Sequence, residues 1–78
     1  MALQDEALEQ MVTNAIRQDK RIGGQAIMVR ATSGEIALKG LVDTLEQLEL
    51  ARLVTQGVPG VRRVSVDELS VRKDDEAQ

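Results

Sequence analysis

The sequence predicts an α+β fold: a two-layer sandwich in helix-strand-strand-helix-strand order, with a three-stranded sheet and two helices on one face. Three observations predict it. Apolar residues recur at helical spacing over residues 3–19 and 44–56. Between these segments, two runs of alternating apolar residues flank the turn pair Ser33-Gly34, which is typical of a hairpin. A valine-rich run over about 62–72 follows, and a right-handed crossover places it in the same sheet.

The first helix is predicted over residues 3–19. Five apolar side chains fall on one stripe at helical spacing, namely Leu8, Met11, Val12, Ala15 and Ile16. Acidic residues in the early turns and basic residues near the end complement the helix dipole. The pair Gly23-Gly24 ends the helical segment.

The two strands of the hairpin each bury one face. Their predicted inward residues are Ile27, Val29 and Ala31 in the first strand and Ile36, Leu38 and Val42 in the second. Gly34 opens the second strand at the turn, and Gly40 lies inside it. Gly40 either admits a ligand close to the backbone or lets a helix pack closely on the sheet, and we favour packing.

The second helix is predicted over residues 44–56. Thr44 and Gln47 match a capping box, with Asp43 as an alternative cap. Gly57 is the expected C′ residue of this helix. The segment Val58-Pro59-Gly60 is a turn, because Pro59 cannot continue a helix.

The last strand changes the parity of its apolar residues. Val64 and Val66 share one parity, whereas Leu69 and Val71 share the other, so a regular strand cannot bury all four. We therefore predict a bulge or twist near Asp67-Glu68. Residues 1–72 then form a single domain, and residues 73–78 form a polar tail that we expect to be disordered.

The composition excludes most enzyme chemistry. The 78 residues contain no His, Cys, Tyr, Trp or Phe, so the commonest general base, the thiolate nucleophile and the commonest metal ligands are absent. We expect no enzyme, no catalytic residue, no cofactor and no metal site. The net charge of −3 disfavours non-specific binding to nucleic acid.

The chain shows no targeting or membrane-spanning pattern. Its first residues carry neither a basic region nor an apolar run, so we expect no signal peptide. No apolar run approaches about 18 residues, so we expect no transmembrane segment. The chain as it stands is expected to be cytoplasmic, or periplasmic if a signal has been removed.

Apolar and glycine positions recur at characteristic spacings from about Asp19 to Val71. They read Ile27-x-Val29, Gly34-x-Ile36-x-Leu38-x-Gly40-x-Val42, Ala51, Val58-Pro59-Gly60-Val61-x-x-Val64 and Leu69-x-Val71. In this order they resemble the BON domain, a small module of bacterial envelope and stress proteins. Thr55 and Asp67 depart from the family, which usually has a small residue and often Asn near these positions.

The resemblance implies a fold and a kind of function. The family fold is a helix, a hairpin, a second helix and a third strand. Its members are regarded as non-catalytic modules that bind phospholipid membranes, often as tandem copies or beside other binding modules. The family has no fixed catalytic residues, so the resemblance supplies no site.

Basic residues form the first candidate binding surface. Arg30 and Lys39 take the outward parity of the hairpin, and the adjacent Arg62 and Arg63 begin the last strand, where they would point to opposite faces. With Arg72 and Lys73 at its end, they form a candidate basic patch for anionic phospholipid headgroups. The alternative is ordinary solvated charge, and Asp67 and Glu68 interrupt the patch.

Surplus apolar residues form the second candidate surface. On the second helix, Leu48, Ala51, Val54 and Val58 share the arc that faces the sheet. Leu53 points away from this arc, with Leu45 or Leu50 near its ends, while Leu41 and Met28 are left over on the hairpin. We expect these residues to meet a protein partner, a second copy or a bilayer, unless they are scattered surface residues.

Two further motifs receive structural interpretations. Gly57-Val58-Pro59-Gly60 matches the Gly-x-x-Gly loop of KH nucleic-acid domains, but it joins a helix to a strand and is followed by no aromatic residue. We interpret it as a helix end and turn, with Gly34, Gly40 and Gly60 as structural glycines. Asp74-Asp75-Glu76 lacks the spacing of a calcium loop and is interpreted as solvated tail.

Overall fold

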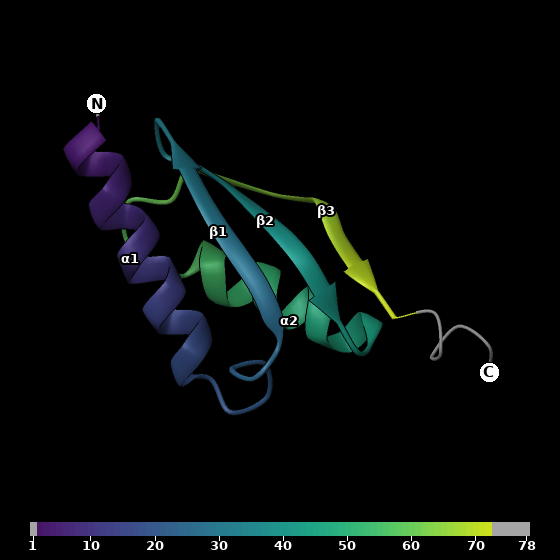
Figure 1. Ribbon diagram of the computed structural model, residues 1–78. Helices are drawn as coiled ribbons and strands as arrows, with labels where there is room; N and C mark the ends of the chain where they lie inside the picture. The colour runs from purple at the N-terminus through teal and green to yellow at the C-terminus, as the bar shows by residue number, and fades with distance from the viewer. Residues whose placement is uncertain (1, 73–78) are drawn as a thin grey trace.

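The computed structural model, which describes residues 2–72, has two helices and a three-stranded mixed sheet (Figure 1). The elements are α1 (Ala2–Gln18), β1 (Ala26–Thr32), β2 (Glu35–Val42), α2 (Leu45–Gln56) and β3 (Arg63–Val71). Their order confirms the predicted α+β fold. The predicted tail over 73–78, which includes Asp74-Asp75-Glu76, lies outside the described residues.

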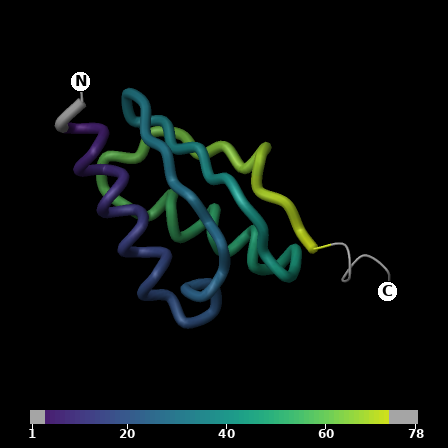
Figure 2. Tube along the Cα trace, viewed as in Figure 1, coloured from purple at the N-terminus to yellow at the C-terminus, as the bar shows by residue number. Residues whose placement is uncertain are grey.

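The sheet has the strand order β1-β2-β3, with β2 in the centre. β1 pairs with β2 antiparallel, whereas β3 pairs with β2 parallel, so α2 is the crossover between parallel strands. Figures 1 and 2 show α2 behind the sheet and α1 beside β1, with the opposite face of the sheet toward the viewer. The helices therefore leave one face of the sheet uncovered.

The core lies between the helices and the inward face of the sheet. Its buried apolar members are Leu8, Val12, Ile16, Ile22, Ala31, Ile36, Leu38, Val42, Ala51, Val58 and Leu69. The sequence pattern anticipates most of these apolar residues but not Ile22. It also does not anticipate the burial of a polar residue, Thr55. Thr55 is fully buried, and its hydroxyl donates to the carbonyl oxygen of Ala51 at 2.7 Å, which satisfies the polar atom inside the core.

Local hydrogen bonds explain where α2 begins and ends. The Thr44 hydroxyl accepts from the Gln47 backbone at 3.1 Å, and the Gln47 side chain accepts from the Thr44 backbone at 3.1 Å. The predicted capping box is therefore confirmed. Gly57 was expected as a C′ residue, but it is the C-cap with a helical φ of −79°. Its N–H still bonds within the last turn, so it needs no left-handed backbone.

The hairpin turn has the geometry that the sequence predicts. Ser33 and Gly34 have φ values of 53° and 86°, the positive values of a two-residue turn that matches strand twist. α1 braces the outer edge of this hairpin with two carboxylates. Glu9 accepts from the Ala31 N–H and Asp5 accepts from the Ser33 N–H, both at 3.0 Å. These contacts satisfy donors that β2 does not reach.

A bulge in β3 resolves the conflict of parity. The register pairs Ala37 with Ser65 but Lys39 with Glu68, so β3 holds one residue more than β2 between these pairs. The bulge predicted near Asp67-Glu68 is confirmed. It returns Leu69 to the inward face, where only 4% of the residue is exposed.

Gly40 has a structural role, with a different neighbour from the one expected. Its φ is +131°, which side chains rarely adopt, and a Cβ there would overlap the carbonyl oxygen of Ala26. The close neighbour is thus the backbone of β1 and not a helix. The expectation that Gly40 makes room for helix packing was wrong in this respect.

Candidate functional site

The uncovered side of the sheet is the first candidate surface, and we call it the open face. Strand register assigns to it Ala26, Met28, Arg30, Thr32, Glu35, Ala37, Lys39, Leu41, Arg63, Ser65, Glu68 and Ser70. It combines apolar, cationic and anionic side chains. Three of the predicted contact cations share it: Arg30, Lys39 and Arg63.

Two apolar side chains lie together on the open face. Met28 pairs with Lys39, and Ala26 pairs with Leu41, so Met28 and Leu41 are diagonal neighbours across β1 and β2. Met28 is 64% exposed and Leu41 is 38% exposed. This pair is defined as the apolar pair of the open face, and Lys39 lies beside it. Both residues were predicted to be left over from the core.

Carboxylates accompany the cations of the open face. The Lys39 Nζ lies 3.5 Å from the Glu68 Oε1, and the Arg63 Nη1 lies 3.9 Å from the Glu35 Oε2. Such exposed and loosely paired charges contribute little to stability. Together with Arg30, the side chains that strand register assigns to the open face include three cations and two carboxylates, which gives this face a net charge of +1. Asp67 in the bulge of β3 adds another carboxylate to this strand.

Two further predicted cations, Arg62 and Arg72, make other contacts. Arg62 precedes β3, its N–H donates to the Gly34 carbonyl at 2.7 Å, and its aliphatic stem packs over Gly34. Arg72 forms an ion pair with Asp43, with 2.6 Å between the Arg72 Nε and the Asp43 Oδ1. Lys73 lies outside the described residues. Among the described cations of the predicted patch, strand register thus assigns Arg30, Lys39 and Arg63 to the open face.

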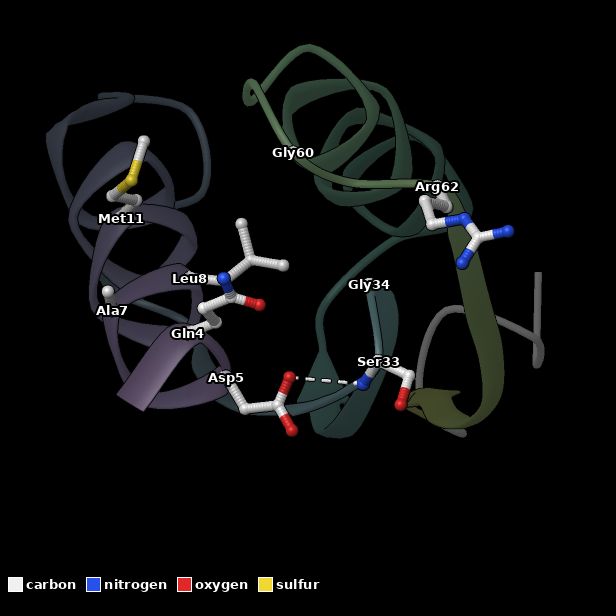
Figure 3. Close-up of a pocket in the computed structure, with 9 residues that line it drawn as sticks. All are labelled: Gln4, Asp5, Ala7, Leu8, Met11, Ser33, Gly34, Gly60 and Arg62. Carbon is white, nitrogen blue, oxygen red and sulfur yellow. Dashed lines mark hydrogen bonds between the residues drawn. The ribbon is translucent and has the colours of Figure 1, made fainter. Parts of the chain in front are cut away.

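A cleft of about 550 Å³ lies between α1, the hairpin turn and the loop after α2 (Figure 3). Asp5 lines it, and its carboxylate is bound to the Ser33 N–H. In Figure 3, the Arg62 guanidinium points away from α1 and from the side chain of Leu8. Because its polar groups do not converge, the cleft presents no arrangement for catalysis.

The Gly57–Gly60 loop uses its backbone donors internally. The Val58 N–H donates to the Thr55 carbonyl at 3.1 Å, and the Val61 N–H donates to the Val58 carbonyl at 3.2 Å. Val58 itself is 8% exposed. The loop is a turn between α2 and β3, with Gly60 at a φ of +98°, and offers no row of free donors to a phosphate backbone.

Two charged side chains in the loop after α1, Asp19 and Arg21, have pKa values that their surroundings shift. Hydrogen bonds from the Arg21 side chain and backbone hold the pKa of Asp19 at about 2, below its ordinary value of 3.8. The Asp19 carboxylate in turn raises the pKa of Arg21. The pair closes the loop after α1. Within residues 2–72, no three acidic side chains gather as a metal site, and neither helix is long and apolar enough to cross a membrane.

The second candidate surface is a shallow hollow between α1 and α2, which we call the helix groove. Its volume is about 490 Å³, and of the nine described residues that line it none is charged. Leu53, predicted to point away from the core, lies at this groove and is 53% exposed. Leu45 is 65% exposed but lies outside the groove lining, whereas Leu50 packs against the core.

Sequence patterns did not identify the rest of the helix groove. Met11 was assigned to the core stripe of α1, yet it is 45% exposed at the groove. Asn14, Gln18 and Pro59 also line it. The helical period places Met11 on the apolar side of α1, but it does not reveal where α2 stops covering that side.

The chain was compared with models of known protein families. The family model described as BON domain matches residues 4–73, which is most of the chain. A search of curated proteins finds no match.

Proposed function

The chain belongs to the BON domain family, and we propose that it is a non-catalytic module that attaches weakly and reversibly to anionic phospholipid surfaces through the open face. One observation carries the proposal. The face that the helices leave uncovered presents the apolar pair Met28 and Leu41 beside Arg30 and Lys39. Apolar side chains flanked by cations suit the boundary between headgroups and acyl chains.

Magnitudes indicate weak attachment by a single domain. A net cation near an anionic leaflet contributes about 1 kcal/mol, so the charge balance of the open face supplies about that amount. Burying the parts of Met28 and Leu41 that are still exposed, 64% and 38%, contributes roughly 1.5–3 kcal/mol for the two residues together. The total of roughly 2.5–4 kcal/mol corresponds to a Kd of about 1 mM or weaker. Two linked copies would bind much more tightly because the second contact becomes intramolecular.

Vesicle co-sedimentation tests the proposal. We expect the chain to pellet with phosphatidylglycerol vesicles at low salt, to pellet less with phosphatidylcholine, and to lose about fivefold in affinity at about 0.15 M salt. Arg30→Gln should weaken pelleting. Arg52→Gln is the matched control, because Arg52 lies on α2 and pairs with Glu49 at 2.7 Å. Equal pelleting with both lipids, or none at low salt, would contradict the proposal.

A protein partner for the open face is the second candidate. The observation that favours it is the charge pairing of Lys39 with Glu68 and Arg63 with Glu35, which leaves little net charge for lipid. A partner with complementary mixed charges would fit such a surface. Amide chemical shifts of Met28 and Leu41 that move when a partner protein is added, and do not move with vesicles, would favour this candidate over lipid.

A further inference from the structure

The helix groove is set apart by its lack of charge. Charged residues make up 29% of the chain, yet none lines the groove. The cleft of Figure 3, by contrast, is lined by Asp5 and Arg62. An uncharged hollow with exposed apolar walls is the kind of surface that another apolar surface covers.

The walls of the groove provide the apolar area for such a contact. Met11 of α1 is 45% exposed and Leu53 of α2 is 53% exposed. Between these helices the groove also takes in Ala15 and Val54, which are already partly buried against the core. Protruding side chains and the hollow between them therefore belong to the same patch.

Charge restricts the occupant. The groove offers no cation to an anionic headgroup and no ion-pair partner to a strongly charged protein. Two copies of this chain each carry a net charge of −3 and repel each other wherever acidic surfaces meet. Contact through an uncharged groove avoids placing carboxylates opposite one another.

The polar residues that line the groove favour a second copy of this chain as the occupant. Asn14 and Gln18 carry side-chain amides, each with both a donor and an acceptor. Identical amides can therefore pair across a two-fold axis. A two-fold contact also closes the assembly at two copies, and it allows the protruding Leu53 of each copy to enter the hollow of the other.

From these observations we infer that the helix grooves of two copies pack against each other and form a weak two-fold dimer. The open face stays free in this dimer, because it lies on the other side of the sheet from the helices. The inference does not depend on what the open face binds. The two open faces would point away from each other in this dimer, so they could not both reach one flat bilayer, and dimerisation is not expected to tighten attachment to a single vesicle.

Sedimentation equilibrium of the full chain over about 10 μM to 1 mM tests the inference, a range suited to small interfaces. We expect the mass of the wild type to rise from one copy toward two. Leu53→Glu should raise the dimer Kd at least tenfold, because it buries an unpaired carboxylate against a like-charged copy. Leu45→Glu is the matched control, an exposed leucine of the same helix outside the groove, and should leave the Kd within about twofold.

Cross-linking provides a second measurement that does not depend on the folding of Leu53→Glu. The chain has no cysteine, so Asn14→Cys introduces a single thiol at the groove and Glu46→Cys a single thiol away from it. Under mild oxidation, Asn14→Cys should form a disulfide-linked dimer many times faster than Glu46→Cys. Equal rates would contradict the inference.

Three results would overturn the dimer. The first is a wild-type chain that remains a monomer at the highest concentration. The second is equal weakening by Leu53→Glu and Leu45→Glu, which would indicate non-specific association. The third is loss of vesicle binding by Leu53→Glu with no change in mass, which would make the groove a lipid surface.

Discussion

The open face and the helix groove expose apolar side chains on opposite sides of one sheet, and they differ in charge. Met28 and Leu41 share their face with Arg30, Lys39 and Glu68, whereas Met11 and Leu53 have no charged neighbour lining their groove. Charge beside an apolar pair suits a charged, hydrated boundary such as a lipid headgroup layer. An apolar hollow without charge suits a like surface. The comparison shows that exposed leucines and methionines alone do not identify a partner.

The largest effect is expected from a substitution that destabilises the whole domain and so disrupts the open face and the helix groove together. Gly40→Val forces a branched side chain into a backbone at φ +131° and against the Ala26 carbonyl, so we expect a loss of about 3 kcal/mol or more in the free energy of unfolding. Chemical denaturation measures it. Gly24→Ala is the control, because a Cβ at residue 24 meets no atom within 4 Å. An unchanged midpoint for Gly40→Val would contradict the structural role of this glycine.

A pair of variants should separate the two surfaces. Met28→Glu removes half of the apolar pair and cancels the small positive balance of the open face, so phosphatidylglycerol binding should fall at least tenfold, about 1.4 kcal/mol. Its dimer Kd should not change. Leu53→Glu should behave in the opposite way. If either variant impairs both properties while its melting midpoint is normal, the two surfaces are not independent.

Loosening α1 should affect the helix groove more than the open face. Glu9→Ala deletes the acceptor of the Ala31 N–H, a hydrogen bond of 3.0 Å that joins α1 to β1. We expect a loss of about 1 kcal/mol in stability and faster hydrogen exchange of the Ala31 amide. Glu6→Ala, an exposed position on the same helix, is the control. Protection of the Ala31 amide that survives Glu9→Ala would contradict the bracing role.

The smallest effect concerns acid pH and lies outside both surfaces. The pKa of Asp19 is held at about 2 by Arg21, below the ordinary 3.8, so the folded state favours the ionised form. The resulting stability is present above pH 3.8 and is lost as the pH falls toward 2. Asp19→Asn should therefore lose stability at neutral pH and show a flatter profile between pH 4 and 2. Denaturation midpoints across this range measure it, and parallel profiles would contradict the expectation.

The sequence predicts those features of the fold that depend on neighbouring residues. The Thr44 capping box, the Ser33-Gly34 turn and the change of parity that required a bulge are all local patterns, and each is confirmed. The burial of Ile22 and Thr55 depends on how distant elements pack, so periodicity does not reveal it. The neighbour of Gly40 is likewise a matter of strand pairing.

Surface composition was harder to predict than the fold for the same reason. The pairing of Lys39 with Glu68 follows from the shifted register of β3, which is known only when the bulge is placed. Arg62 and Arg63 are adjacent in sequence, yet only Arg63 joins the open face because Arg62 precedes the strand. The exposure of Met11 depends on where α2 stops covering α1.

One co-sedimentation series tests the central claim, that the open face is the surface that attaches to anionic lipid. It compares the wild type, Met28→Glu and Leu53→Glu on phosphatidylglycerol vesicles at low salt, at concentrations where the wild type is a monomer. We predict that the wild type and Leu53→Glu pellet equally and that Met28→Glu remains in the supernatant. Pelleting of Met28→Glu equal to that of the wild type would contradict the account.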